Sequence, residues 1–302
     1  MYHYWGFGLH ILSEIEFPEL LPFEFDVPDV TIRFGKTPET LQGDDVVHRV
    51  RVSMSPNEYL LKTLGIASYY AANGNKIIIE PLDDVDEKSV RLFLLSNAFA
   101  AILHQRSVVP LHASAIIAND GLILICGNSK AGKSTLLKAL NLDGFEIFSD
   151  DICVLNKSKS NDVVAYSSYP MLKLWEDSYD KIGLDVPDNS LRIRSELPKY
   201  ANFYHDKFQT KSYPIRGIFV LDTVDSFDEI NLSKLNKMQA FVEIQRNCYR
   251  PFQLQSMNKK ATLLPIAAYL AENKPVYKMV RSVQFNTTTR MVALIKSIAA
   301  DL

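Results

Sequence analysis

The sequence has few cysteines, almost no net charge and no long apolar run, and each absence excludes a class of protein. Cys126, Cys153 and Cys248 are the only cysteines among 302 residues, and their spacing fits neither a disulfide framework nor a metal site. The formal net charge of −2 gives no basic surface for nucleic acid or an anionic membrane. No apolar run approaches the length of a membrane span. We therefore expect a protein that binds neither nucleic acid nor membranes.

The composition that remains is typical of a globular protein, with 47% hydrophobic and 23% charged residues. No secretory signal is predicted, because Glu14 and Glu16 fall where such a signal needs an apolar core. Together with the scattered cysteines, this predicts a soluble, cytoplasmic protein. The length suits one large domain with a smaller one.

Residues 1–83 are predicted to form the smaller unit, which is rich in β-strands. Polar and apolar residues alternate from Arg49 to Val52, as they do in a half-buried strand. Asn73 and Gly74 lie between two runs of strand-forming residues and predict a β-hairpin.

Residues 84–302 are predicted to form a larger α/β domain. Asp84 and Glu87 resemble a capping box at the start of a helix. Residues 113–125 are predicted to form a strand, a turn and a second strand, and residues 215–221 another strand. Two later helices are expected, one capped by Ser233 and containing Met238, and one packed on the core through Met291, Leu294, Ile295 and Ile298.

Residues 127–135 read GNSKAGKST and carry the strongest functional signal. They contain the pattern G-x-x-x-x-G-K-[ST], which runs from Gly127 to Ser134. An apolar run at residues 121–126 precedes the pattern, and a helical run at residues 133–141 follows it. This strand–loop–helix context is the one in which the pattern binds the phosphates of a nucleotide.

The chemistry of such a loop predicts ATP and Mg²⁺ as ligands. Gly127 and Gly132 allow the backbone to wrap closely around phosphates. Consecutive N–H groups and the start of the helix attract the anion. Lys133 is expected to reach the β- and γ-phosphates, and the Ser134 hydroxyl to bind Mg²⁺. The other residues expected to contact the nucleotide are Asn128, Ser129, Lys130, Ala131 and Thr135.

Asp150 and Asp151 lie 17 and 18 residues beyond Lys133, which leaves room for one short helix and one short strand. The two carboxylates should therefore emerge at a strand end beside the loop. One can bind the metal and the other can accept a proton from an attacking hydroxyl. We assign Asp150 as the base and Asp151 to the metal; the alternative is a solvated turn without function.

His112 is the third candidate for the catalytic site. It begins a strand that leads through a tight turn into the strand before the loop, so both ends of that hairpin should lie on one side of the sheet. An imidazole there would tune the acidic pair. The alternative is a structural histidine.

Three segments together resemble a known family. Residues 111–116, 127–134 and 149–152 resemble the catalytic domain of HPr serine kinase/phosphorylase, in which a histidine precedes the phosphate loop and an Asp-Asp pair follows it closely. The resemblance implies a P-loop HPr-kinase-like α/β domain and a serine kinase. It assigns the family's catalytic and metal roles to His112, Lys133, Ser134, Asp150 and Asp151.

The N-terminal part is similar to a branch of this family found in lasso-peptide biosynthesis. The similarity lies in residues 4–14, in residues 17–20 and in the pair Gln105 and Arg106. It implies phosphoryl transfer to the C-terminal serine of a precursor peptide. Thr135 departs from the acidic residue of many HPr kinases, and residues 215–217 only partly match a later family signature, which argues against HPr as the substrate.

Two alternative functions stay open. One is a kinase of an HPr-like carrier protein or of free serine, and the other is a nucleotide-binding regulator without phosphotransfer. The acidic pair favours a kinase, because a protein that only binds nucleotide needs no base. The sequence leaves open whether the chain forms a homo-oligomer.

The acceptor is expected to need a cationic cradle near the transferred phosphate. Arg192 and Arg194, with Lys199 nearby, are the candidates, because arginine binds carboxylate or phosphate through two parallel hydrogen bonds. A solvated basic loop or an exposed strand is the alternative. Arg246 and Arg250 compete for the same role.

Overall fold

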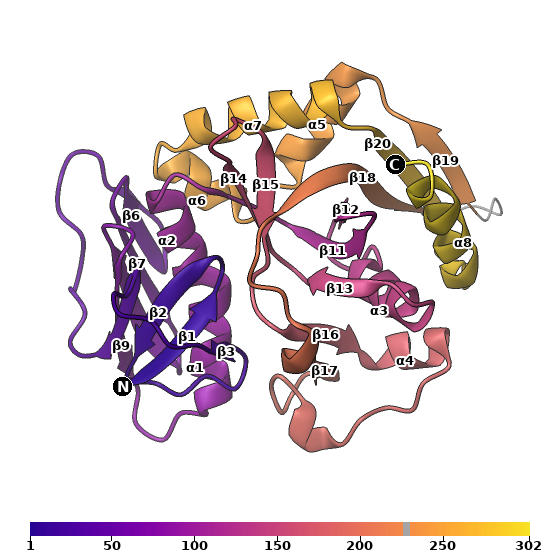
Figure 1. The fold of residues 1–302 in the computed structure, drawn as a ribbon. Coiled ribbons are helices and arrows are strands. Elements are labelled where there is room, and N and C mark those ends of the chain that lie inside the picture. Colours follow the sequence, from indigo (N-terminus) through magenta and orange to yellow (C-terminus); the bar gives the residue numbers. More distant parts are fainter. Residues whose placement is uncertain (226–229) are drawn as a thin grey trace. The chain divides into compact units, whose positions relative to one another are not determined.

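A computed structural model describes residues 1–225 and 230–302, which form two compact units of mixed α/β structure (Figure 1). The first unit comprises Met1–Pro110 and Tyr249–Leu263, and the second comprises Leu111–Cys248 and Leu264–Leu302. The units divide at residues 110 and 111, whereas the sequence placed the boundary between residues 83 and 84. The difference arises because the helices that follow residue 84 pack on strands of the first unit.

The first unit contains a nine-stranded sheet in the order β3-β1-β2-β4-β9-β8-β7-β6-β5. The pairs β2–β4 and β4–β9 are parallel, and the other pairs are antiparallel. The hairpin predicted at Asn73 and Gly74 is confirmed, and both residues have positive φ. The strands are β1 (Tyr2–Gly6), β2 (Leu9–Ser13), β3 (Leu21–Pro22), β4 (Val30–Phe34), β5 (Val47–His48), β6 (Val52–Ser55), β7 (Glu58–Thr63), β8 (Ala67–Ala72) and β9 (Lys76–Pro81).

A helical segment packs on this sheet. It consists of α1 (Glu87–Phe93), the π-helical turn η1 (Leu94–Ala98) and α2 (Phe99–Gln105), and α6 (Pro251–Ser256) packs against α2. The predicted capping box at Asp84 is wrong. Asp86 caps α1 by accepting hydrogen bonds from the N–H groups of Lys88 and Ser89, whereas Asp84 adopts a left-handed conformation.

The second unit is built around β12 and β18, which pair in parallel. Strand β11 pairs with the other edge of β12, and β20 extends the sheet beyond β18. The strands are β11 (Ala113–Ala118), β12 (Gly121–Gly127), β13 (Glu146–Ser149), β14 (Cys153–Lys157), β15 (Val163–Tyr166), β16 (Met171–Trp175), β17 (Lys199–Phe203), β18 (Tyr213–Val224), β19 (Ile230–Lys234) and β20 (Val276–Ser282); the short β10 (Val109–Leu111) spans the boundary between the units.

Helices α3 and α8 cover one face of this sheet (Figure 1). The predicted C-terminal stripe is confirmed as core, because Met291 and Ile295 are buried while Leu294 and Ile298 pack against the same cluster. The helical elements are α3 (Lys133–Leu142), α4 (Glu176–Ile182), α5 (Lys237–Arg246), α7 (Lys260–Asn273), which crosses the boundary, α8 (Thr288–Ala299), and the 3₁₀ turns η2 (Asn189–Leu191) and η3 (His205–Lys207).

Helix α5 begins later than the sequence predicted. Ser233 lies in β19 and caps no helix. Asn236 caps α5 instead, in a capping box with Gln239. Each side chain accepts a hydrogen bond from the other residue's backbone N–H. The capping residue therefore lies three positions beyond the expected one.

Strand β11 is antiparallel to both β12 and β13, and this pairing positions the functional residues. Strands β12 and β13 therefore run in the same direction and end at the same edge of the sheet. The start of β11 lies at that edge too, since Ala113 pairs with Cys126 and Ala115 with Ser149.

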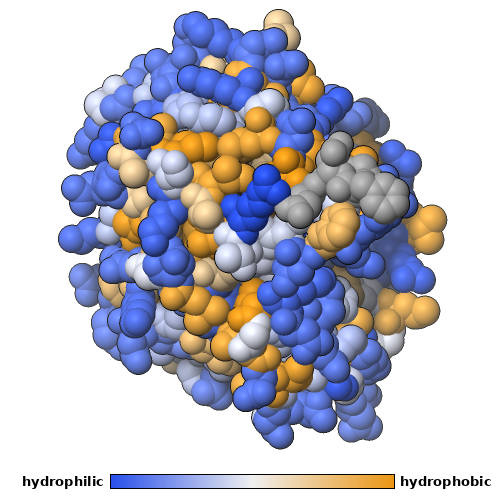
Figure 2. Space-filling view, turned by 90° about the vertical axis from the view of Figure 1, so that its right-hand side faces the viewer, coloured by the Kyte–Doolittle hydropathy of each residue, from blue (hydrophilic) through white to orange (hydrophobic). Residues whose placement is uncertain are grey.

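The side of the second unit that carries α8 and β19 has a mixed surface. Figure 2 shows apolar side chains among hydrophilic ones on this face. Within the part of the chain that the structure describes, no helix is both long enough and apolar enough to cross a membrane.

Candidate functional site

Residues 127–134, called the glycine loop from here on, connect the end of β12 to the start of α3. Gly127 has a φ of 141°, and a Cβ atom built on it would lie 2.5 Å from the carbonyl oxygen of Leu221 in β18. Gly132 has a φ of 103° and precedes the first turn of α3. The loop therefore requires glycine at both positions, one for a close approach to β18 and one for the turn into the helix.

Two side chains from outside the glycine loop hold it in place. The side-chain oxygen of Asn247 accepts a hydrogen bond from the Gly127 N–H at 2.8 Å, and the Asn247 carbonyl accepts one from the His112 N–H at 2.7 Å. The Arg281 guanidinium donates to the Ala131 carbonyl at 3.1 Å. Asn247 thus fixes the start of the loop and the start of β11 together.

The Lys133 ammonium is buried, and all three of its protons find acceptors. It donates to the carbonyls of Gly127 at 2.7 Å and Asn128 at 3.1 Å, and it lies 3.0 Å from His112 Nε2. Because an ammonium can only donate, His112 Nε2 is the acceptor and His112 Nδ1 carries the ring proton. Burial lowers the pKa of Lys133, against the opposing charges of Asp151 and Asp150.

Asp150 follows the last residue of β13 and is 1% exposed. It accepts hydrogen bonds from the hydroxyl of Ser114 at 2.7 Å and from that of Ser134 at 2.9 and 3.1 Å. The backbone N–H of Lys173 donates to it at 3.2 Å. Its carboxylate therefore fixes the first turn of α3 to β11 and β16.

Asp151 lies beside Asp150 but has different partners. Its φ of 69° turns the side chain toward Lys173, whose ammonium lies 2.8 Å away, and toward His112 Nδ1 at 3.3 Å. Burial by itself raises the pKa of Asp151, but the charge of Lys173 and the His112 hydrogen bond outweigh it and hold the pKa well below its usual range. A left-handed backbone conformation is unfavourable for a residue other than glycine, and residues held in such conformations are often found at functional sites.

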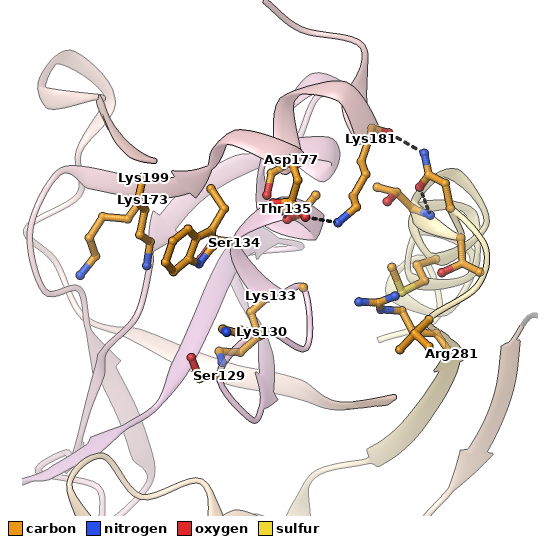
Figure 3. A pocket seen from close by; sticks show the side chains of 18 of the residues that line it. Ser129, Lys130, Lys133, Ser134, Thr135, Lys173, Asp177, Lys181, Lys199 and Arg281 are labelled. Atoms are coloured by element: carbon orange, nitrogen blue, oxygen red, sulfur yellow. Dashed lines mark hydrogen bonds and ion pairs between the residues drawn. The ribbon is translucent and has the colours of Figure 1, made fainter. Parts of the chain in front are cut away.

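A cavity of about 680 Å³ lies in front of these groups. It is lined by the glycine loop, by His112 and Asp151, by the hairpin of β16 and β17, by α4, and by the end of β20 with the start of α8. In Figure 3, Lys173 and Lys199 lie on one side of the cavity and Arg281 on the other, with Lys130 and Lys133 between them. Asp151 lines the cavity. Asp150 does not line it, and its carboxylate accepts a hydrogen bond from the Ser134 hydroxyl.

Most of the residues singled out in the sequence come together here. Those that line the cavity are His112, Ser129, Lys130, Gly132, Lys133, Ser134, Thr135 and Asp151. Gly127, Asn128 and Ala131 belong to the same loop and act through its backbone.

Arg192 and Arg194 do not line the cavity, contrary to the expectation for an acceptor cradle. The Arg192 guanidinium packs on the Tyr200 ring and donates to the Ser195 carbonyl at 3.2 Å. Arg194 lies 3.5 Å from a Glu196 carboxylate oxygen. Both guanidinium groups thus contact neighbouring residues of the same segment, although Arg194 Nε makes no hydrogen bond. Arg246 at the end of α5 likewise pairs with Glu243, and Arg250 lies in the first unit.

Sequence reasoning missed Lys173, Trp175 and Arg281, and it gave Lys199 only a supporting role. One signal for Lys173 was present, since it interrupts the apolar run from Met171 to Trp175, and a lysine in a buried strand needs a partner. Arg281 and Asn247 carry no local signal, because they reach the loop only through the pairing of distant strands and helices.

The residues present suit Mg²⁺, although within residues 1–225 and 230–302 no group of three or more His, Cys, Asp or Glu is placed to hold a metal ion. Mg²⁺ in a nucleotide site is bound through one or two protein oxygens and completes its shell with phosphate and water. The Ser134 hydroxyl and the Asp150 carboxylate, already in contact, supply oxygen donors of that kind.

The comparisons with known proteins found a likeness among solved structures but none among sequence families or curated proteins. Among solved structures, a match is found to the Hpr(Ser) kinase/phosphatase from Coxiella burnetii, with 12% identity, over 64% of this chain and 97% of that chain, at a TM-score of 0.32. A likeness at that TM-score supports no assignment of function.

Replacing Lys173 by Met should raise the pKa of Asp151, because burial then acts against a weaker opposing charge. Titration of the Asp151 carboxyl carbon by NMR measures this directly, and an unchanged pKa would contradict it. Lys181→Met is the matched control, because Lys181 lines the same cavity but pairs with Asp177.

The same change should lower stability in a defined pH window. A depressed aspartate pKa stabilises the folded state above the unfolded value of about 3.9, and the contribution is lost as pH falls through the folded value. The difference in unfolding free energy between wild type and Lys173→Met should therefore be largest at neutral pH and shrink in acid.

Proposed function

We propose that this chain is an ATP- and Mg²⁺-dependent kinase that transfers the γ-phosphoryl group to a serine hydroxyl of a peptide. The observation that carries the proposal is the convergence of three groups at one sheet edge. These are the Lys133 ammonium, the Ser134–Asp150 contact and the Asp151–His112 pair. Phosphoryl transfer needs a phosphate cradle, a metal and a group that orients the acceptor, and these three groups can supply them.

The glycine loop is the proposed phosphate cradle. Its N–H groups and the start of α3 attract an anion, and Lys133 adds a full positive charge. The ammonium is held by backbone carbonyls and by a neutral imidazole, which are neutral acceptors that a phosphate oxygen can displace.

We propose Ser134 and Asp150 as the metal-binding pair. The sequence assigned Asp151 to the metal, but it is Asp150 that contacts the Ser134 hydroxyl. When bound, Mg²⁺ would neutralise charge that develops on the phosphates. Asp150 is buried and held by two hydroxyl groups, so its carboxylate is fixed for that role.

We propose Asp151, and not Asp150, as the group that receives the acceptor proton. It faces the cavity, and His112 Nδ1 holds it in place by donating to its backbone carbonyl at 2.9 Å, with its carboxylate 3.3 Å away. As the serine oxygen forms its bond to the γ-phosphorus, the bond from phosphorus to the β–γ bridging oxygen breaks and ADP leaves. The hydroxyl proton passes to Asp151. Its low pKa makes it a weak base, so its main contribution is to orient the hydroxyl until that proton becomes acidic.

The narrower proposal is a P-loop HPr-kinase-like enzyme that acts in the cytoplasm on a lasso-peptide precursor, and it rests on the sequence resemblance. A kinase of a small carrier protein or of free serine uses the same reacting groups. A nucleotide-binding regulator without phosphotransfer would need neither the cavity-facing Asp151 nor its contact with His112.

Intact-mass analysis of serine-containing peptides incubated with the protein, ATP and Mg²⁺ tests the proposal. We expect a gain of one phosphate on a serine hydroxyl, and we expect Lys133→Met to abolish it while leaving the protein folded. Release of inorganic phosphate from ATP without any modified peptide, protein or free serine would contradict a kinase.

Replacing the two aspartates should change different kinetic quantities, the Mg²⁺ requirement for Asp150 and kcat for Asp151. Asp150→Asn should raise the Mg²⁺ concentration needed for half-maximal activity by roughly tenfold or more, because a charged oxygen donor is lost. Asp151→Asn should lower kcat by about 100-fold or more at an unchanged Mg²⁺ requirement. Steady-state kinetics across a series of Mg²⁺ concentrations distinguishes the two effects. The opposite pattern would identify Asp151, and not Asp150, as the metal ligand.

A further inference from the structure

The cavity extends beyond the glycine loop onto one face of the hairpin of β16 and β17. Lys173 and Trp175 are two residues apart on β16, so they point to the same face. Lys199 lies directly opposite Trp175 in the antiparallel register, which puts it on that face too. All three line the cavity, and Figure 3 shows Lys173 and Lys199 together on the side away from Arg281.

Lys199 differs from two other lysines that line the cavity, because it has no carboxylate partner among the residues that the structure describes. Lys173 is paired with Asp151, and Lys181 is paired with Asp177. Within residues 1–225 and 230–302, Lys199 has no carboxylate oxygen within 4.0 Å of its ammonium. Its close neighbour is the Trp175 ring, whose centroid lies 5.3 Å from Lys199 Nζ.

The surroundings of Lys199 favour an anionic ligand. Burial lowers the pKa of the half-buried Lys199, and the nearby charge of Lys173 lowers it further, while Asp151 and Asp150 oppose the shift. A desolvated ammonium on an indole face, with no ion pair, gains more from binding an anion than an exposed lysine does.

We propose that Lys199, on Trp175, is a binding site for an anionic group of the acceptor, separate from the nucleotide phosphates. The proposal rests on the kinase function above and adds the recognition of its acceptor. The chemical class is an acceptor that carries a carboxylate close to its hydroxyl, because Lys199 lines the same cavity as Asp151 and shares a face of the hairpin with Lys173, which pairs with Asp151. The glycine loop with Lys133 serves the nucleotide, which leaves the Lys199 ammonium for the acceptor.

Two binding measurements on the intact chain separate this site from the nucleotide site. First, Mg·ADP is titrated into each variant by calorimetry. Second, the Mg·ADP-saturated protein is titrated with O-phospho-L-serine and, separately, with its carboxamide, which lacks the carboxylate. Wild type should bind the acid about tenfold more tightly than the amide, as expected for one charge-assisted hydrogen bond.

The variants follow from the same geometry. Lys199→Met should bring the affinities for acid and amide to within about twofold, with Mg·ADP affinity unchanged, and Lys199→Arg should restore the preference. Arg192→Met is the matched control, because it removes a nearby cation outside the cavity, and the preference should persist. The Mg·ADP titration also shows that each variant is folded.

The outcomes distinguish this inference from the proposed function. Equal binding of acid and amide by wild type overturns the inference, and so does a loss of Mg·ADP affinity in Lys199→Met that matches any loss of phosphoserine binding. The second result would place Lys199 in the nucleotide site. Failure of wild type to bind Mg·ADP at all would instead overturn the kinase assignment.

Discussion

Strand β11 is hydrogen-bonded antiparallel to β12 on one edge and to β13 on the other, and the arrangement of the site depends on this pairing. The glycine loop follows the end of β12, Asp150 follows the end of β13, and His112 precedes β11, which lies between those two strands. All three are brought to one edge by backbone hydrogen bonds alone. The strand order already brings these residues close together. The side-chain contacts of Ser134 with Asp150 and of Lys133 with His112 then stabilise that arrangement.

The charged groups at this edge of the sheet are costly to bury, and each of them has hydrogen-bond or ion-pair partners. An unpaired buried charge costs several kcal/mol, about as much as a large part of the net stability of a domain. Lys133 has three acceptors, Asp150 has three donors, and Asp151 has a lysine and a histidine. Replacing such a network by apolar side chains is often neutral or stabilising. Its presence in front of a cavity therefore points to function and not to stability.

The parts of the site that are close in sequence were predictable, and the parts joined by strand pairing were not. The loop pattern, the short gap to Asp150 and the hairpin that starts at His112 are local features, and the structure places them together. Helix starts were misplaced at Asp84 and Ser233, because several residues that can cap lie within a few positions of each other.

The acceptor side could not be derived in the same way. Arg192 and Arg194 looked suitable by residue type, but neither lines the cavity, and each contacts a residue close to it in sequence. Lys199 faces the cavity because β17 pairs with β16 in one register, and a shift by one residue would turn it away. The two aspartates likewise look equivalent in sequence, and only the left-handed conformation of Asp151 separates their roles.

The proposed kinase function requires that the glycine loop bind the phosphates of Mg·ATP. Titration of the isotopically labelled wild-type protein with Mg·ATP, followed through its backbone amide NMR signals, tests this most directly. We expect large, saturable shifts of the amide signals of Gly132, Lys133 and Ser134, since their N–H groups lie at the loop and the start of α3. Saturable shifts confined to other parts of the chain, with these three signals unmoved, would contradict it.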